Sequence, residues 1–301
     1  MSAGAVRSLE SRATEVALHR AIADLAREAS IEINAPEIKH LAASRSILPA
    51  GKRMYVSHLP KQSWEETIAA TREVGVAGFV PIPHVPVRLL SSAETADRVI
   101  GALAVYTNEV LLIAGDYAQP SGPYASTLDL MRTGLLQHHG LTGVSFAGHP
   151  EGHPRVALDE IRRAELDKAR WIEEAGLASS LVTQFFFESA PFLEWTNTLR
   201  DAGVRSKIVA GVAGPASIAK LVRFAVRCGV GRSLRALSSR PNVMTQLLNE
   251  HGPETLLAEL AQARLEGGVS FDAIHVFGFG GFLRTCEWLQ RVAAGDFDLE
   301  R

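Results

Sequence analysis

The chain has 301 residues, of which 47% are hydrophobic and 21% are charged, and its formal net charge at pH 7 is −2. This composition is typical of a globular protein and excludes a disordered one. A charge so close to zero gives no indication of a nucleic-acid-binding or membrane-binding surface. The two cysteines, Cys228 and Cys286, have neither metal-ligand nor disulfide spacing, so we expect a reduced, cytoplasmic protein.

The first 30 residues mix acidic and basic side chains with alanine and leucine, which predicts an N-terminal helix and differs from a signal peptide. Beyond them, short apolar runs alternate with longer segments of helical periodicity. The predicted strands are 31–36, 53–58, 78–83, 109–116, 143–150, 181–188, 207–214 and 273–280. The predicted helices are 63–74, 93–107, 124–138, 158–174, 191–202, 216–228, 253–266 and 282–293, with a short extra helix at 243–249.

Strand–helix alternation implies right-handed crossovers and a parallel sheet. Eight repeats predict a (β/α)₈ TIM barrel with an added N-terminal helix, and we expect residues 1–301 to form a single catalytic domain. The alternative is a doubly wound sheet, which usually has a glycine-rich turn after its first strand. The first strand here, Glu32-Ile-Asn-Ala-Pro36, has no such turn.

The sixth predicted strand contains a single amide, Gln184, in an otherwise apolar and β-branched run. Parallel strands that are covered on both faces are almost continuously apolar. A buried amide without a hydrogen-bonding partner costs roughly 1–3 kcal/mol, so Gln184 requires either a side-chain partner or a ligand.

Polar groups also stand at the C-terminal ends of most other strands, where the active site of a TIM barrel lies. They are Glu32, Ser57, His58, His84, Asp116, His149, His153 and His275, with Gly278, Gly280 and Gly281 after the last strand. Each has an ordinary structural interpretation: Glu32 could form a buried ion pair, and Asp116 could open a turn. His149 and His153 flank Pro150 in a loop and lack the helical spacing of a metal-binding pair, so no metal site is predicted.

The residue types at these strand ends narrow the chemistry. No lysine ends a central strand, which argues against a Schiff-base aldolase, and no cluster of acidic ligands marks a metal-dependent enolase-type site. Histidine, glutamine and carboxylate groups with aromatic neighbours suit an organic cofactor or a polar heteroaromatic substrate.

Three motifs together resemble the methylenetetrahydrofolate reductase family. Thr183-Gln184-Phe185-Phe186-Phe187 is similar to the family's sixth strand, and His149-Pro-Glu-Gly-His153-Pro is similar to its strand-five loop. Gly115-Asp116, followed by Tyr124-Ala125-Ser126, is similar to its strand-four cofactor loop. Glu32, four residues before Pro36, resembles the family's catalytic glutamate, and the resemblance runs in order over residues 30–290.

The resemblance implies a barrel that reduces 5,10-methylenetetrahydrofolate to 5-methyltetrahydrofolate with NADH or NADPH, by way of FAD. It implies that Glu32 is the general acid and that Asp116 and Gln184 assist it; burial in a barrel should raise the pKa of Glu32. We expect the substrate to lie against Gln184, Phe186 and Phe277. The residues expected along the flavin are Ser57, His84, Gly115, Asp116, Tyr124, Ala125, Ser126, His149, His153 and Glu165.

Two positions depart from the family's pattern near the expected FAD diphosphate. Ala114 replaces an arginine and Ile172 replaces a lysine, and each lost charge-assisted bond should weaken FAD binding by about 1–3 kcal/mol. One alternative therefore keeps the reaction and passes the hydride directly from NADH to folate. A further alternative is a folate-binding barrel without turnover, whereas an unrelated barrel lyase would require the three motifs to match by chance. The expected partners are small molecules, and the sequence leaves a homo-oligomer, the choice of NADH or NADPH and the pathway open.

Overall fold

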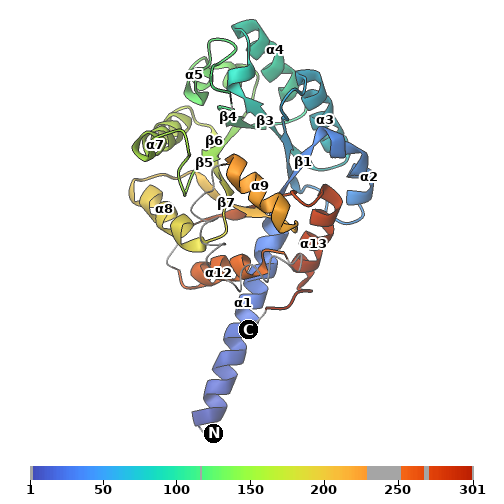
Figure 1. The fold of residues 1–301 in the computed structure, drawn as a ribbon, viewed down its shortest axis with the longest axis vertical. Coiled ribbons are helices and arrows are strands. Elements are labelled where there is room, and N and C mark those ends of the chain that lie inside the picture. Colours follow the sequence, from blue (N-terminus) through green and yellow to red (C-terminus); the bar gives the residue numbers. More distant parts are fainter. Residues whose placement is uncertain (1–2, 116, 229–251, 268–270, 300–301) are drawn as a thin grey trace.

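The computed structural model describes residues 3–115, 117–228, 252–267 and 271–299. Eight parallel strands close into a barrel in chain order (Figure 1). The strands are β1 (Ser30–Asn34), β2 (Arg53–Ser57), β3 (Val80–Pro86), β4 (Glu109–Ile113), β5 (Gly143–Gly148), β6 (Ala178–Phe185), β7 (Lys207–Ala213) and β8 (Ala273–Phe277). The closed barrel with helices between its strands confirms the predicted (β/α)₈ architecture.

The helices lie around the barrel, and most of them separate successive strands. They are α1 (Ala3–Glu28), α2 (Leu41–Ser44), α3 (Trp64–Val76), α4 (Ala93–Ala104), α5 (Thr127–Met131), α6 (Leu135–His138), α7 (Leu158–Glu174), α8 (Ser189–Asp201), α9 (Ile218–Cys228), α12 (Glu254–Leu265) and α13 (Phe282–Ala294). Two 3₁₀ helices, η1 (Ala35–His40) and η2 (Val87–Leu89), follow β1 and β3.

The alternation of side chains along each strand separates an apolar shell from a more polar barrel interior. On β1, Ile31 and Ile33 are buried in the core between the sheet and the helices. Glu32, the residue between them, faces the other way and reaches His84 and His275 of β3 and β8. This arrangement places titratable side chains inside the barrel without disturbing its outer core.

Two predicted elements differ from the structure. Strand β3 continues to Pro86, so His84 lies within the strand and its side chain points into the barrel, whereas the sequence suggested a loop position. The segment predicted as one helix over 124–138 forms two short helices, because Gly134 adopts a left-handed conformation with φ of 75° between them. Asp116 and the predicted helix at 243–249 lie outside the described residues.

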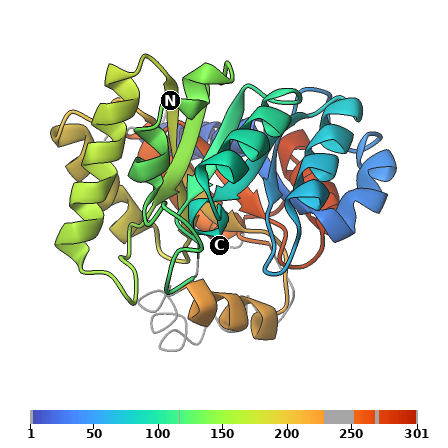
Figure 2. The ribbon, with the colours of Figure 1, turned by 90° about the horizontal axis from the view of Figure 1, so that it is seen from above.

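Helix α1 begins well away from the barrel, and its C-terminal part packs against α12 and α13 (Figure 1). Its last turn is held by Lys52, which donates hydrogen bonds to the carbonyl oxygens of Ala26 and Arg27 at 3.3 and 2.7 Å. Helix α9 lies at one end of the barrel, apart from the surrounding ring of helices (Figures 1 and 2). Among the described residues, no helix combines the length and apolar character needed to cross a membrane.

Candidate functional site

The centre of the candidate site is a carboxylate between two imidazoles. Nε2 of His84 and Nε2 of His275 each lie 3.7 Å from the same oxygen of Glu32, Oε2. Neither nitrogen has a hydrogen-bonding partner within the described chain, although both are buried. Two buried imidazole nitrogens directed at one carboxylate form a group that can hold and exchange a proton.

The pKa of Glu32 lies below its usual value. Burial alone raises the pKa of this carboxyl, but the side-chain interaction with His275, the electrostatic influence of His84 and His275 and a hydrogen bond with Ser57 together outweigh burial. Burial lowers the pKa of His84 to about 4, so His84 is uncharged at neutral pH. Among the groups that lower the pKa of Glu32, His275 contributes most. The raised pKa expected from burial alone is therefore wrong for this structure, and Glu32 is ionised at neutral pH.

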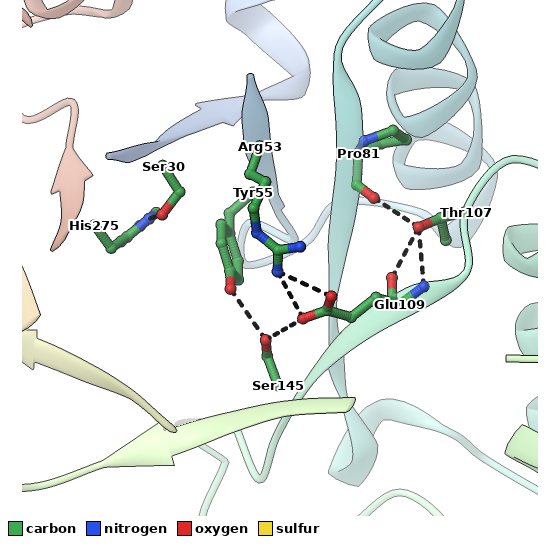
Figure 3. Close-up of polar contacts among 8 residues, drawn as sticks. All are labelled: Ser30, Arg53, Tyr55, Pro81, Thr107, Glu109, Ser145 and His275. Atoms are coloured by element: carbon green, nitrogen blue, oxygen red, sulfur yellow. Dashed lines mark hydrogen bonds and ion pairs between the residues drawn. The ribbon is translucent and has the colours of Figure 1, made fainter. Parts of the chain in front are cut away.

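The orientation of His275 is fixed by one hydrogen bond and two ring contacts. Its Nδ1 lies 2.9 Å from the hydroxyl of Ser30, and its ring makes an edge contact with Tyr55 at 4.7 Å between centroids (Figure 3). A further edge contact, with Phe277, has the same 4.7 Å between centroids. Sequence analysis placed His275 at a strand end without giving it a role. The sequence feature that could have placed His275 inside the barrel is the alternation along β8, which puts residues 273, 275 and 277 on the inner face.

A second polar network forms the floor of the barrel (Figure 3). Tyr55 donates to the hydroxyl of Ser145 at 3.0 Å, Ser145 donates to Glu109 at 2.6 Å, and Arg53 donates to both carboxylate oxygens of Glu109 at 2.9 Å. Every member therefore has a partner, which is how a polar network inside a barrel avoids the cost of unsatisfied groups.

A cavity of about 740 Å³ opens below this floor, at the N-terminal ends of the strands. Its charged lining is paired internally, for example Arg53 with Glu109 and Arg205 with Glu173. It lies at the opposite end of the barrel from the Glu32 cluster, so we do not assign it to the chemistry; in TIM barrels that end serves stability.

Gln184 lies near the C-terminal end of β6, where the pairing with β7 is irregular between Val182 and Phe185. Its neighbour Thr183 accepts a hydrogen bond from the backbone N–H of Gly211 at 2.8 Å. The half-buried Gln184 side chain has no hydrogen bond within the described chain. Its amide therefore remains available to a ligand, one of the two outcomes expected from the sequence.

An aromatic cluster lies beside β6 and β8 at the same end of the barrel. Phe224 of α9 stacks on Phe279 at 4.2 Å between centroids, and Phe279 is parallel to Phe277 at 5.4 Å. Phe185 contacts both Phe277 and Phe279 edge to face. Phe277 is thus part of a wall of parallel rings that can receive a flat heteroaromatic ring. Sequence analysis missed Phe224 and Phe279, because only the fold brings them together.

Phe186, also expected to contact substrate, faces the opposite side of β6. It is 2% exposed, and its ring stacks on Phe192 of α8 at 4.8 Å. Adjacent strand residues point to opposite faces, and Phe186 belongs to the core between the sheet and the helices.

The residues expected along the flavin are spread over several environments. Ser57 and His84 lie beside Glu32 in the barrel, whereas Tyr124 is 4% exposed and packs in the outer core. Ser126 is the N-cap of α5, where its backbone N–H bonds to Asp129. Ala125 is exposed, and Gly115 adopts φ of 90°, a conformation that favours glycine.

His149, His153 and Glu165 form part of the loop after β5. The rings of His149 and His153 meet edge to face at 5.8 Å. Glu165 is 1% exposed and accepts hydrogen bonds from the His149 backbone, from Arg162 and from the indole of Trp195, at 2.8, 2.8 and 3.0 Å. Although burial alone raises the pKa of Glu165, these bonds lower it below its usual value. Its contacts anchor the loop and α8 to α7.

Two arginines that reach these loops are engaged by protein groups. Arg88 donates to the carbonyl oxygens of Ala125 and Tyr117, each at 2.8 Å. Arg162 donates to Glu165 and to two loop carbonyls. Both guanidinium groups therefore serve to shape protein loops, and neither replaces the arginine absent at position 114.

Position 172, where the family resemblance implies a lysine that binds the FAD diphosphate, also lacks an available cation. Ile172 is fully buried in the core, and the nearest lysine on α7, Lys168, lies over the ring of Phe146 at 5.3 Å. Burial lowers the pKa of Lys168. Neither of the two family positions that would hold cations near the FAD diphosphate, Ala114 and Ile172, therefore carries one in this chain.

Comparison with known proteins identifies the family. A family model described as methylenetetrahydrofolate reductase matches residues 83–235, slightly more than half of the chain. The chain belongs to the methylenetetrahydrofolate reductase family. The matched segment includes His84, Gln184 and Phe224, while Glu32 and His275 lie outside it.

Individual members of the methylenetetrahydrofolate reductase family match over shorter segments. Methylenetetrahydrofolate reductase (NADH) 1 of Arabidopsis thaliana is 30% identical over 132 residues, which is 40% of this chain and 22% of that protein. The 5,10-methylenetetrahydrofolate reductase of Pectobacterium carotovorum is 28% identical over 149 residues, 48% of this chain and 45% of that protein. The alignments thus span less than half the length of either relative.

A solved structure supports the fold over almost the whole chain. A protein from Clostridium thermocellum that binds two copies of 5-methyl-5,6,7,8-tetrahydrofolic acid superposes with a TM-score of 0.59 and 12% identity. The superposition covers 90% of this chain and 95% of that one. At this identity the likeness concerns the barrel fold alone.

Proposed function

We propose that this chain reduces 5,10-methylenetetrahydrofolate to 5-methyltetrahydrofolate with NADH or NADPH as the electron donor. The observation that carries the proposal is the group formed by Glu32, His84 and His275, in a barrel of the methylenetetrahydrofolate reductase family. The unpartnered amide of Gln184 and the parallel rings of Phe277 and Phe279 support it, because a pterin offers both hydrogen-bonding edges and a flat face.

The reaction consumes one hydride and one proton. A proton placed on one of the two nitrogens that hold the methylene bridge breaks that carbon–nitrogen bond and leaves an iminium, which the hydride then converts to a methyl group. In the proposed mechanism Glu32 delivers this proton. Because Glu32 is ionised at neutral pH in this structure, it must take up the proton before the bond breaks.

Gln184 and the aromatic wall would orient the substrate. The amide of Gln184 can donate to and accept from the pterin ring, and the face of Phe277 can cover one side of it. Asp116 stays a prediction as a further substrate contact, because it lies outside the described residues.

Our inference about the hydride source rests on the cations that this chain lacks at the positions expected to bind the FAD diphosphate. Arg88 and Arg162 are bonded to protein groups and Ile172 lies in the core, so these positions do not supply the cations that the family resemblance places at the FAD diphosphate. We therefore favour direct transfer from the nicotinamide to the folate iminium, with both molecules bound at the barrel mouth.

The test is one preparation of the purified full chain. Its visible spectrum is recorded, and NADH and NADPH oxidation is measured with methylenetetrahydrofolate, with and without added FAD. Turnover in colourless protein that is unaffected by FAD is the expected result. Yellow protein with FAD-dependent turnover would overturn direct transfer but keep the reductase, whereas no oxidation under any condition would overturn the reductase itself.

A second candidate function is folate binding without turnover, which is favoured by the ionised state of Glu32. A carboxylate that stays ionised when folate binds accepts hydrogen bonds from a pterin but does not donate a proton. Measurable binding of 5-methyltetrahydrofolate by calorimetry, together with no oxidation of either dinucleotide, would support this candidate.

A further inference from the structure

A group of three metal-ligating side chains lies outside the barrel, on two neighbouring outer helices. Asp97 belongs to α4, His138 is the last residue of α6, and His139 follows it. Each residue offers one ligand atom, and the three atoms lie within 4.8 Å of one another. Among the described residues this is the one group of three such side chains so close together, and it is separate from the Glu32 cluster.

His139 is held in place by two features of α4. Its Nε2 lies 2.9 Å from Oδ1 of Asp97. Its ring also covers Gly101 so closely that a Cβ at that position would be 2.8 Å from Cε1 of the imidazole. Asp97 and Gly101 are four residues apart and therefore share one face of the helix. The same face supplies a carboxylate and a groove that receives the ring.

His138 completes the group from the adjacent position in the chain. Its ring meets that of His139 edge to face, with 4.9 Å between centroids and 76° between planes. The side chain is exposed, and no hydrogen bond restrains its ring within the described chain. It can therefore turn about its side-chain bonds without breaking a contact that the fold needs.

These dimensions are close to those of a tetrahedral metal site. With bonds of about 2.0 Å to nitrogen and oxygen, neighbouring ligand atoms of a tetrahedral zinc ion are about 3.3 Å apart. The 2.9 Å between Nε2 of His139 and Oδ1 of Asp97 is slightly shorter than this separation. The 4.8 Å within which all three ligand atoms lie is about 1.5 Å longer than it. The ligand atoms reach this spacing if His139 and Asp97 move slightly apart and the ring of His138 turns toward them.

The donor set defines the class of ion. Imidazole nitrogen suits zinc, cobalt, nickel and copper, while calcium and magnesium prefer a site made entirely of oxygen. Three protein ligands leave a fourth position for water.

We propose that Asp97, His138 and His139 bind one divalent transition-metal ion and thereby link α4 to α6. The competing explanation is that the bond between His139 and Asp97 is only a polar tether between these helices. The two explanations differ in the role of His138, because the tether does not use it and the metal site requires it.

The test is a titration of the full chain, freed of metal with a chelator, with Zn²⁺ in an isothermal calorimeter. We expect one ion per chain, bound with a dissociation constant on the order of micromolar, and a visible spectrum of tetrahedral Co²⁺ when cobalt replaces zinc. His138→Ala and Asp97→Asn should each raise the dissociation constant at least about tenfold, a change equivalent to about 1.4 kcal/mol.

The matched control is His40→Ala, which removes a histidine outside this group and should bind zinc like the parent. Circular dichroism of each variant establishes that it is folded, and loss of an exposed ring at position 138 leaves the tether intact. Absence of zinc binding in the parent chain would overturn the proposal. Equal affinity in the parent, His138→Ala and Asp97→Asn would do so too, because the ion would then be held elsewhere. Neither outcome depends on the proposed reductase activity.

Discussion

At the residue scale, Glu32 is the side chain on which the proposed chemistry depends. Replacing it by glutamine keeps its shape and removes its proton, so folate reduction should fall by roughly 10²–10⁴-fold. Because the pKa of Glu32 is lowered, only a small fraction of Glu32 is protonated near neutral pH, and this fraction decreases further as pH rises. Since the protonated form is the active one, kcat/KM for folate should decrease with increasing pH in the parent protein. Steady-state assays from about pH 5 to about pH 8 measure both effects.

The control for this experiment is Glu160→Gln, which changes an exposed carboxylate on α7 and should leave the rate and its pH dependence unaltered. Near-normal folate turnover in Glu32→Gln would show that another group supplies the proton.

Gln184 allows a second prediction at the same scale. Because its amide has no partner within the described chain, Gln184→Leu should leave the thermal midpoint nearly unchanged. The same change removes a hydrogen bond to substrate worth about 1–3 kcal/mol, so KM for folate should rise by about 5- to 150-fold. Thr183→Val is the contrasting variant: it leaves the buried Gly211 N–H without its 2.8 Å acceptor and should lower the midpoint instead. A large loss of stability in Gln184→Leu would contradict a purely ligand-binding role.

The sequence identified the residue types of this site better than their surroundings. Glu32 and Gln184 could be located from their strands, because alternation and strand order place strand ends together. The low pKa of Glu32 could not, since it depends on the distance to His275, a residue about 240 positions away in the chain. Phe186 could be located from its motif but not assigned to a face. A motif of three phenylalanines does not reveal which ring points into the barrel and which packs against α8.

At the element scale, Glu165 joins α7 to the loop after β5 and to α8. Removing its carboxylate leaves the donors of His149, Arg162 and Trp195 without an acceptor in a buried environment. We expect Glu165→Ala to lower the free energy of unfolding by about 3–5 kcal/mol, as measured by urea denaturation. Glu160→Ala, on the exposed side of the same helix, should change it by less than about 0.5 kcal/mol. A similar, small effect in both variants would mean that the loop is held by other contacts.

Elements were predicted well where apolar periodicity was strong and poorly where single residues decided the backbone. All eight strands follow from their apolar runs, and the helix predicted over 63–74 is α3, which begins at Trp64 with Ser63 as its N-cap. The division of 124–138 into α5 and α6 depends on one glycine, Gly134, in a left-handed conformation. Strand β3 continues past Pro83 because β4 pairs with its residues 84–86, a tertiary effect that local sequence does not show.

At the scale of the whole molecule, closing a barrel around titratable groups makes its stability depend on pH. The pKa of His84 is about 4 in the folded protein, against its usual value of 6.5 in an unfolded chain. Between these values the unfolded chain binds more protons than the folded one, so stability falls as pH falls through this window. Glu32, whose pKa is also lowered, acts in the same direction, because protonation removes the favourable interaction with His275.

We therefore expect the free energy of unfolding to be highest above about pH 6.5 and to decrease by up to about 3 kcal/mol on acidification to about pH 4 because of His84. Urea denaturation at a series of pH values in this window measures the decrease. His84→Asn, which cannot take up the proton, should flatten the dependence, whereas His138→Ala, which removes an exposed histidine, should retain it. An identical pH dependence in the parent and His84→Asn would mean that burial of His84 is not the cause, and that other groups, such as His58, whose pKa burial also lowers, produce the acid sensitivity.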